Sequence, residues 1–431
     1  MLQLDYIAEN FDKAVEGLNK RSLSNGAELL QEALNINDKR KKIQHELDML
    51  KSQSNQLAKE IGGLYKAGKQ TEANDLKNKS TELKEVSKRL SDQLQTAAVE
   101  LQEILYTIPN IPNEIVPAGK SEEDNIEIKR DETNIPLLSE KAKPHWDLIE
   151  EYDIVDFELG NKVTGAGFPF YKGQGARLSR ALINYFLDFA SEAGYDEIQP
   201  PVLVNEESGY GTGQLPDKEG QMYQIADTNL FLIPTAEVPI TNVYRDVILS
   251  EEDLPIKKVG YTPCFRREAG SWGAHVRGLN RLHQFDKVEI VQIAKPENSY
   301  QVLEDMVGHV ERLLITLELP YRILRLCSGD LGFTSAITYD FEVYSAAQKK
   351  WLEVSSVSNF ESFQANRLKL RIKDKENKKI LAHTLNGSAL ALPRIMAAIL
   401  ENNQTVDGIE IPKVLQNYTR FKKIVKNDSK R

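Results

Sequence analysis

Charged and aromatic side chains alternate along residues 260–293, a segment rich in β-branched and aromatic residues that predicts two antiparallel strands and a long loop. Arg266 and Glu268 share a face of the first strand, because side chains two apart on a strand point the same way. The corresponding positions of the second strand are Arg281, His283, Phe285, Lys287 and Glu289. Two guanidiniums, two carboxylates and an aromatic ring suit a nucleotide, since arginine binds phosphate and the ring stacks on a base. A solvated face of cross-strand ion pairs explains the same alternation, and periodicity alone leaves both interpretations open.

Three other segments carry polar groups that a core would not require. Thr235 precedes an expected helix, for which helix capping is a sufficient explanation, but Glu237 lies among apolar neighbours and there requires a cation. A carboxylate and two hydroxyls in Glu353–Ser356 suit magnesium or phosphate and are equally typical of a strand end. Arg394 follows Pro393 in the first turn of an expected helix, where the helix dipole disfavours a cation, so it most simply binds an anion.

One glycine pattern is rejected as a nucleotide site. Residues 63–69 fit G-x-x-x-x-G-K, but Gln70 stands where a phosphate-binding loop has Ser or Thr, and no strand precedes the pattern. The glycines are better explained as a turn between two helices.

The composition indicates a globular protein of two or three domains, because 431 residues exceed one ordinary core. A net charge of -9 excludes a generally basic surface, so any nucleic-acid contact must be local. Cys264 and Cys327 are the two cysteines, which excludes a disulfide framework or cysteine metal site and fits a reducing cytosol. No segment has the apolar length of a signal peptide or membrane span, so we expect a cytoplasmic protein that contacts no membrane.

The elements that position these residues begin with a helical arm. A short helix is expected over residues 5–18, and apolar residues then recur at steps of three and four in two polar stretches, between about 27 and 105. Two long helices joined by a glycine turn are antiparallel and about 50 Å long. Such a rod projects, and its slight excess of Lys and Arg permits contact with a phosphate backbone without establishing it; a solvated coiled coil commonly has such a balance.

The remaining chain predicts strands and helices around the hairpin. Residues 109–143 have the composition of a linker, and a globular domain is expected from 144 to 431. We expect helices over 175–194 and 298–317 and strands over 322–326, 337–343 and 351–357. An edge strand over 195–204, a mobile loop over 208–224, and a frayed basic tail from 413 complete the prediction.

Taken together, these segments resemble the class II aminoacyl-tRNA synthetases, and among them the seryl-tRNA synthetases. Residues 194–203 resemble the first motif of the class, with Pro201 at its dimer interface. Residues 265–268 with Arg281, Phe285 and Glu289 resemble the second motif, and residues 389–397 the third. The serine family is indicated by Thr235-Ala236-Glu237, by residues 277–279 leading to 283–285, by Asn386-Gly387-Ser388 and by the arm.

The resemblance implies an α+β fold, with an antiparallel sheet flanked by helices and an N-terminal coiled-coil arm. It implies an ATP-dependent ligase that forms seryl-adenylate and transfers the seryl group to the terminal ribose of tRNA(Ser), and also of tRNA(Sec). Arg266 and Arg394 would be catalytic, and serine would be bound by Thr235, Ala236, Glu237, Arg266, Glu289 and Ser388. ATP would contact Arg266, Arg267, Glu268, Arg281, Leu282, Phe285, Glu353, Val354, Ser355, Ser356 and Arg394. Glu353 and Ser356 would hold Mg²⁺ with ATP.

The implied organisation is a tRNA-binding domain over residues 1–108, the linker and the catalytic domain, assembled as a two-fold homodimer. The arm would recognise the long variable arm of the tRNA by shape and backbone. Two rivals are a relative that loads a carrier protein and lacks the full arm, and a non-catalytic scaffold with a degenerate domain. Retention of Arg266, Glu268, Glu289 and Arg394 together argues against the scaffold.

Overall fold

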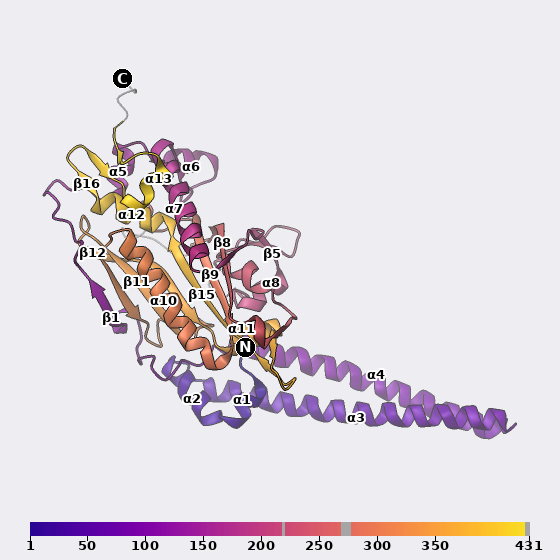
Figure 1. Cartoon of the computed structure of the whole chain (residues 1–431). Coiled ribbons are helices and arrows are strands. Elements are labelled where there is room, and N and C mark those ends of the chain that lie inside the picture. Colours follow the sequence, from indigo (N-terminus) through magenta and orange to yellow (C-terminus); the bar gives the residue numbers. More distant parts are fainter. Residues whose placement is uncertain (218–219, 269–276, 427–431) are drawn as a thin grey trace. The chain divides into compact units, whose positions relative to one another are not determined.

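The computed structural model describes residues 1–217, 220–268 and 277–426, which divide into two compact units at Pro109 and Asn110. In the first unit, short helices α1 (Leu4–Glu9) and α2 (Phe11–Lys20) precede two long helices, α3 (Gly26–Lys66) and α4 (Gln70–Thr107) (Figure 1). The expected single helix over 5–18 is therefore wrong. It is interrupted at Asn10, whose side-chain Nδ2 donates to the Tyr6 carbonyl at 3.2 Å, a local hydrogen bond that competes with helix continuation.

The predicted pair of long helices is confirmed. Ile43, Leu47 and Leu90 are buried in the seam between α3 and α4, with Leu50, Val86 and Leu94 packed around them. The turn between the helices contains Gly68, whose φ of +77° favours glycine. Residues 63–69 thus form a helix end and a turn, as expected from the missing Ser or Thr.

An eight-stranded sheet forms the centre of the second unit, in the order β1-β10-β11-β12-β15-β9-β8-β4. Its strands in chain order are β1 (Ile126–Asp131), β4 (Asp196–Glu197), β8 (Ile256–Phe265), β9 (Gln284–Ala294), β10 (Tyr321–Arg325), β11 (Ile337–Ser345), β12 (Lys350–Asn359) and β15 (His383–Ala391). Neighbouring strands are antiparallel except β4 and β8, which are parallel. This arrangement is the antiparallel α+β core expected from the sequence.

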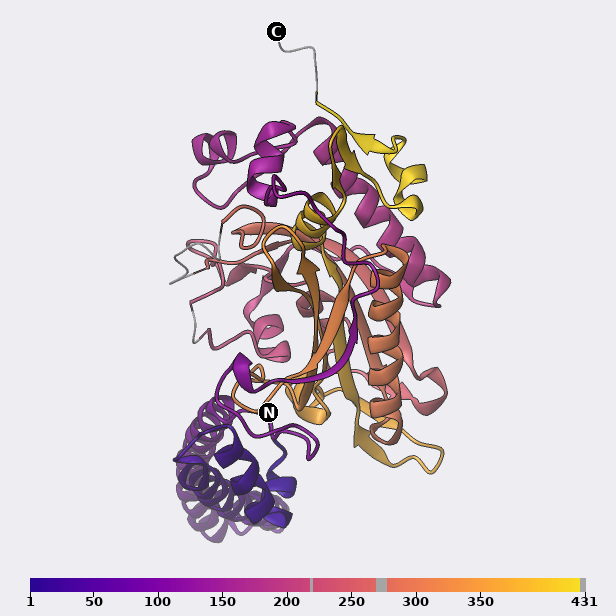
Figure 2. The ribbon, with the colours of Figure 1, turned by 90° about the vertical axis from the view of Figure 1, so that its left-hand side faces the viewer.

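The two faces of this sheet differ in chemistry because polar and apolar side chains alternate along the strands. On β11, Ile337, Tyr339, Phe341 and Val343 are buried in the main hydrophobic core. Helices α7 (Gly173–Glu192), α10 (Ser299–Thr316) and α12 (Leu392–Asn402) contribute to the same core, and α7 and α10 run along one face of the sheet (Figure 2). The intervening polar residues of β11 line a cavity on the sheet.

Shorter elements complete the second unit. They are α5 (His145–Glu151), β2 (Val155–Asp156), α6 (Phe157–Val163), β3 (Phe170–Tyr171), β5 (Leu203–Asn205), α8 (Glu206–Thr212), β6 (Leu230–Leu232), α9 (Glu237–Asn242), β7 (Ile248–Ser250), α11 (Ser362–Leu368), β13 (Arg371–Lys373), β14 (Lys379–Leu381), β16 (Gln404–Thr405), β17 (Gly408–Glu410), α13 (Gln416–Thr419) and β18 (Lys423–Ile424). The 3-10 turns are η1 (Glu122–Asp124), η2 (Glu251–Asp253), η4 (Pro296–Asn298) and η5 (Lys413–Leu415).

Several sequence expectations differ from the structure. The expected strand over 195–204 is two strands in different sheets, β4 and β5, separated by the prolines at 200 and 201, which cannot donate to a strand ladder. The start of the expected loop over 208–224 lies in α8, because the Asn205 side chain accepts from the Ser208 amide and caps that helix.

Two stretches expected to lack regular structure contribute to it. Residues 109–143, expected as a linker, contain β1, which pairs with β10 at the sheet edge. The C-terminal stretch expected to fray contains α13 and β18 up to Ile424, while its last residues, 427–431, lie outside the described residues. Of the expected loop 269–278, only Arg277 and Gly278 lie within the described residues.

Candidate active site

A cavity of about 1060 Å³ lies on the polar face of the sheet. Sheet residues that line it alternate along their strands: Phe285 and Lys287 on β9, Thr338, Asp340 and Glu342 on β11, and Asn386 and Ser388 on β15. Segments beyond the strand ends supply Thr235, Glu237, Arg266, Glu268, Arg281, Leu282 and Arg394. The structure therefore brings together most of the residues that the sequence assigned to ATP and serine.

A β-bulge in β12 places the two predicted metal ligands, Glu353 and Ser356, on this face. Residues three apart on a regular strand point to opposite faces. The register shifts along β12, however, so that Glu353 pairs with Glu342 while Ser356 pairs with Asp340. Since Asp340 and Glu342 share a face of β11, the bulge allows both Glu353 and Ser356 to line the cavity, and the buried Val354 and Ser355 between them also contribute to its lining.

Buried polar side chains form one connected group at the cavity, which we call the buried network. Its members are Thr235, Glu237, Lys287, Glu289, Gln364 and Asn386. The Asn386 amide donates both to Glu237, at 2.9 Å, and to Glu289, at 3.1 Å. Lys287 Nζ lies 2.5 Å from Glu289 Oε2 and donates to Thr235 Oγ1 at 2.9 Å. One hydroxyl, one amide and one ammonium thus connect two carboxylates from different elements.

The charges in the buried network do not balance. Gln364 Nε2 donates to Glu237 Oε1 at 2.7 Å, yet burial, and then the nearby charge of Glu289, raise the pKa of Glu237 to about 7. When both carboxylates are ionised, Lys287 neutralises one of them, which leaves one negative charge. A buried negative charge requires a cationic partner. The network is therefore complementary to a small ligand that carries an ammonium group.

A second set of charges at the cavity is paired and more exposed; we call it the exposed ion pairs. Arg281 pairs with Glu268, and their side chains are 40% and 11% exposed. Arg394 Nη1 lies 3.1 Å from Glu353 Oε2, and these side chains are 33% and 47% exposed. Each pair joins a residue predicted to bind phosphate to a carboxylate predicted to bind the adenine amine or the metal. Without a nucleotide, these residues neutralise one another.

Arg266 belongs to neither group, although its charge acts on the buried network. Its backbone amide donates to the His283 carbonyl at 2.9 Å, which extends the β8–β9 pairing beyond the ladder. Its guanidinium carbon lies 5.2 Å from the centroid of the Phe285 ring, and its positive charge lowers the pKa of Glu237. A ligand carboxylate or phosphate bound by Arg266 would thus lie close to an ammonium bound by Glu237.

Some predicted residues lie away from the cavity lining. Arg267 is exposed and does not line it. Ala236 is buried in a separate apolar cluster, and Glu289 is fully buried, reaching the cavity through Lys287, Thr235 and Asn386. Pro201 is exposed in the segment after β4 and lies away from the cavity lining.

Sequence reasoning missed Lys287, Gln364 and Asn386 as members of the site. Lys287 had a signal, because it alternates with Phe285 and Glu289 on β9. Asn386 stands in the Asn-Gly-Ser motif that indicated the serine family. Gln364 had none, since only the fold brings α11 to Glu237.

Comparison with known proteins agrees with this geometry. The family model for the seryl-tRNA synthetase N-terminal domain matches residues 1–112, and the model for the class II core domain of the G, H, P, S and T synthetases matches residues 222–403. A serine--tRNA ligase of Salinibacter ruber is 49% identical over 98% of this chain and 99% of its own. This chain belongs to the seryl-tRNA synthetase family.

Solved structures share the fold of this seryl-tRNA synthetase family member. The seryl-tRNA synthetase of Pyrococcus horikoshii complexed with ATP is similar with a TM-score of 0.89 and 35% identity, over 99% of this chain and 100% of that one. M. kandleri SerRS in complex with A. aeolicus tRNASec has a TM-score of 0.59 and 16% identity, over 81% of this chain and 72% of that one. In the described part of the chain, no helix is long and apolar enough to cross a membrane.

Proposed function

We propose that the cavity joins L-serine to ATP, giving seryl-adenylate and pyrophosphate, and that the chain then transfers the seryl group to the 3′-terminal ribose of tRNA(Ser). The observation that carries the proposal is the buried network with its uncompensated negative charge beside Arg266. An amino acid has an ammonium for this charge and a carboxylate for the arginine. The family resemblance supplies the choice of serine, and of tRNA(Sec) as a further substrate.

The chemistry needs positioning and charge neutralisation. A serine carboxylate oxygen forms a bond to the α-phosphorus while the bond from that phosphorus to the β-phosphate oxygen breaks, and pyrophosphate leaves. No side-chain nucleophile is required. Arg266 would hold the carboxylate and α-phosphate, and Arg394 would neutralise charge on the phosphates. Glu237 and Glu289 would bind the ammonium and hydroxyl of serine, together with Thr235 and Ser388.

The adenine would lie on Phe285, with Arg281, Leu282 and Glu268 around it, and Glu268 would accept from the exocyclic amine. ATP binding must then separate the exposed ion pairs, because Arg281 and Arg394 already contact Glu268 and Glu353. Both pairs are partly solvated, so their exchange for phosphate contacts costs little. Arg267 has no cavity contact that supports its assignment to ATP, although its backbone amide donates to Gln221 at 2.9 Å.

The residues present fit a magnesium ion that arrives with ATP. Glu353 and Ser356 supply oxygen donors, and the neighbouring Asp340 has a buried Oδ1 with no partner among the described residues. Burial, and then the charge of Glu353, raise the pKa of Asp340 well above its usual value, as expected where a cation would relieve the repulsion. The described residues contain no group of three or more His, Cys, Asp or Glu arranged for a metal. Magnesium would neutralise phosphate charge when bound.

The first unit would bind the tRNA, and the second would be catalytic. Helices α3 and α4 form a continuous seam, which favours a tRNA-binding arm over the armless carrier-loading rival. A homodimer through the segment around Pro201 is part of the same proposal, because a two-fold pair would let one chain's arm serve its partner's cavity.

Pyrophosphate exchange tests the first step. With all amino acids compared, we expect labelled pyrophosphate to enter ATP with serine alone, and serine-independent exchange or exchange with another amino acid would contradict the proposal. Charging of tRNA(Ser) and tRNA(Sec) tests the second step. A variant shortened between Ile43 and Leu94 should exchange normally and fail to charge; equal loss of both activities would assign the arm a structural role instead.

A further inference from the structure

The segment Arg277–Leu282 enters the cavity without support from the sheet. The ladder between β8 and β9 ends at the pair Phe265 and Gln284. Leu279, Asn280, Arg281 and Leu282 nevertheless line the cavity. Contacts outside the sheet must therefore fix where Arg281 and Leu282 lie relative to a bound nucleotide.

Two backbone groups of this segment are held by side chains from other elements. The Leu279 amide donates to His145 Nε2 at 2.9 Å, and the Asn280 carbonyl accepts from Arg394 Nε at 3.1 Å. Gly278 has a φ of +67°, and a Cβ there would lie 2.3 Å from His145 Nε2. Only glycine permits this backbone conformation together with this approach of the imidazole.

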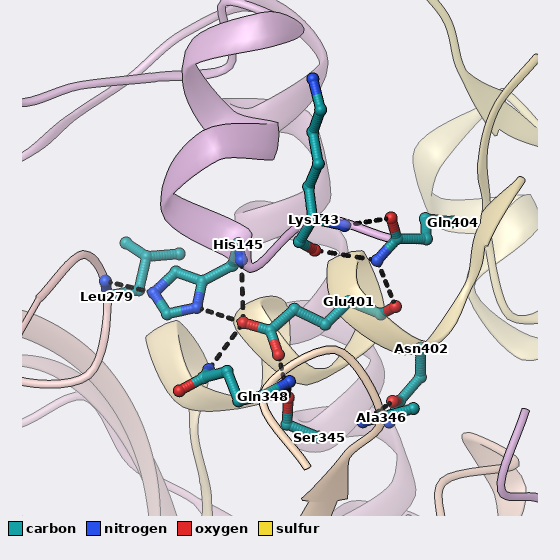
Figure 3. Close-up of polar contacts among 9 residues, drawn as sticks. All are labelled: Lys143, His145, Leu279, Ser345, Ala346, Gln348, Glu401, Asn402 and Gln404. Atoms are coloured by element: carbon teal, nitrogen blue, oxygen red, sulfur yellow. Dashed lines mark hydrogen bonds and ion pairs between the residues drawn. The ribbon is translucent and has the colours of Figure 1, made fainter. Parts of the chain in front are cut away.

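His145 is itself fixed by Glu401 at the end of α12, as Figure 3 shows. Both side chains are fully buried. Glu401 Oε1 accepts from His145 Nδ1 at 2.6 Å, from the His145 amide at 2.8 Å and from Gln348 Nε2 at 2.7 Å, and the Ser345 hydroxyl donates to Oε2. The Gln404 side chain also binds both backbone groups of Lys143, two residues before His145. Its Oε1 accepts from the Lys143 amide, and its Nε2 donates to the Lys143 carbonyl.

These contacts determine the tautomer of His145. A backbone N–H can only donate, so Nε2 must be the unprotonated nitrogen that accepts from Leu279. The ring proton then lies on Nδ1 and points to Glu401. Burial opposes ionisation of Glu401, but the hydrogen bonds from His145 and Ser345 and the nearby imidazole together lower its pKa, so it remains a carboxylate able to accept. The carboxylate thus selects the tautomer that presents an acceptor to the segment.

Residues at both ends of helix α12 consequently hold the segment Arg277–Leu282 in place. Arg394, in its first turn, contacts Asn280 directly, and Glu401, in its last full turn, acts on Leu279 through His145. The two contacts lie on consecutive residues immediately before Arg281. Any displacement of His145 would therefore move Arg281 and Leu282 relative to Arg394, which is itself assigned to ATP.

We infer that His145, oriented by Glu401, is a positioning residue that places the Arg281–Leu282 backbone for ATP. A merely structural pair in the core would stabilise the fold without affecting one substrate more than another. A positioning residue instead alters ATP binding selectively. This inference rests on the proposed function, because that function assigns ATP to the cavity.

Matched substitutions separate the two halves of the contact. In His145→Gln, the side-chain amide reaches the former position of Nε2 and retains an acceptor for Leu279. In His145→Asn, the shorter amide retains a donor to Glu401 but offers no acceptor at the Nε2 position. Losing one hydrogen bond to a buried amide should raise the ATP Kd of His145→Asn about tenfold, with the serine KM within about twofold of the parent. His145→Gln should stay within about threefold of the parent in both quantities.

Calorimetric titration with ATP alone measures this Kd without turnover. Equal ATP affinities for the parent and His145→Asn, or equal losses in both variants, would overturn the inference. If His145→Asn fails to fold by circular dichroism, an ester in place of the Leu279 amide removes only the N–H donor; a Kd within about twofold of the parent would then overturn it. A parent that binds ATP but shows no serine-dependent exchange would contradict the proposed function alone, and the Kd comparison would still decide this inference.

Discussion

The buried network and the exposed ion pairs face the same cavity but use charge in opposite ways. In the buried network, Asn386, Gln364, Thr235 and Lys287 hold two carboxylates in place before any ligand is present. In the exposed ion pairs, Arg281 and Arg394 are occupied by Glu268 and Glu353. The buried network favours discrimination between ligands, because its geometry is fixed and its excess negative charge fits a ligand with an ammonium group. The exposed ion pairs favour exchange, because partly solvated pairs are separated at little cost.

The largest effect is expected at Arg266, because its charge acts on the buried network while its guanidinium lies on Phe285. Arg266→Ala should lower kcat/KM for serine-dependent exchange about 10³-fold, since the lost group would hold the reacting carboxylate and phosphate. Arg267→Ala is the matched control, because that side chain is exposed and outside the cavity lining. If kcat/KM of a folded Arg266→Ala protein fell less than tenfold, the buried network and the exposed ion pairs would act without a contribution from Arg266.

The raised pKa of Glu237 predicts a pH dependence confined to serine. With a pKa of about 7, Glu237 is largely protonated at pH 6 and ionised at pH 8. An ammonium ligand requires the carboxylate, so the serine KM should fall about tenfold over this range, while the ATP KM changes little. Glu237→Gln should abolish the pH dependence. A serine KM that is flat between pH 6 and pH 8 in the parent would contradict the assignment.

The raised pKa of Glu237 also predicts how the thermal stability of the ligand-free protein changes with pH. The folded-state pKa of Glu237 lies above the ordinary value of 4.5, so its favourable contribution is complete below that value and is lost as pH rises through about 7. The ligand-free protein should therefore gain thermal stability between pH 8 and pH 6 from this group, and Glu237→Gln should lose that gain.

The smallest effect is expected at the exposed ion pairs. Glu268→Gln releases Arg281 and replaces the acceptor expected for the adenine amine. Because the pair is partly solvated, the ATP KM should change about threefold, with the serine KM unchanged. Steady-state exchange at two salt concentrations measures both, and the salt dependence should weaken in the variant. A change in the ATP KM above thirtyfold would mean that the pair Arg281 and Glu268 is as rigidly positioned as the buried network.

Much of the fold follows from the periodicity of the sequence. The seam of the arm, the β8–β9 hairpin and helices α7 and α10 lie close to where the apolar spacing predicts them. The failures have local causes. Asn10 interrupts a helix, prolines at 200 and 201 divide a strand, and β1 is hidden in a polar stretch because it lies at an edge with almost no buried side chains.

The candidate site was predictable where one element carries several of its residues. Alternation on β9 links Phe285 to Glu289, and family motifs mark Arg266 and Arg394. Gln364 and the pair His145 and Glu401 carry no comparable signal. His145 lies 256 residues from Glu401, and tertiary packing alone brings the imidazole and the carboxylate of two such remote segments together. The β12 bulge was also unpredictable, although Glu353 and Ser356, which the sequence assigned to ATP and magnesium, both line the cavity.

That bulge makes β12 respond very differently to two kinds of mutation. A substitution at one position changes one side chain. Deletion of Val354 would remove the extra residue, and Glu353 and Ser356 would then lie two positions apart on one face of a regular strand. An insertion or deletion after Ser356 would instead exchange the polar and apolar faces for the rest of the strand. The strand should therefore accept many single substitutions over evolutionary time, while its length beyond Ser356 remains nearly invariant.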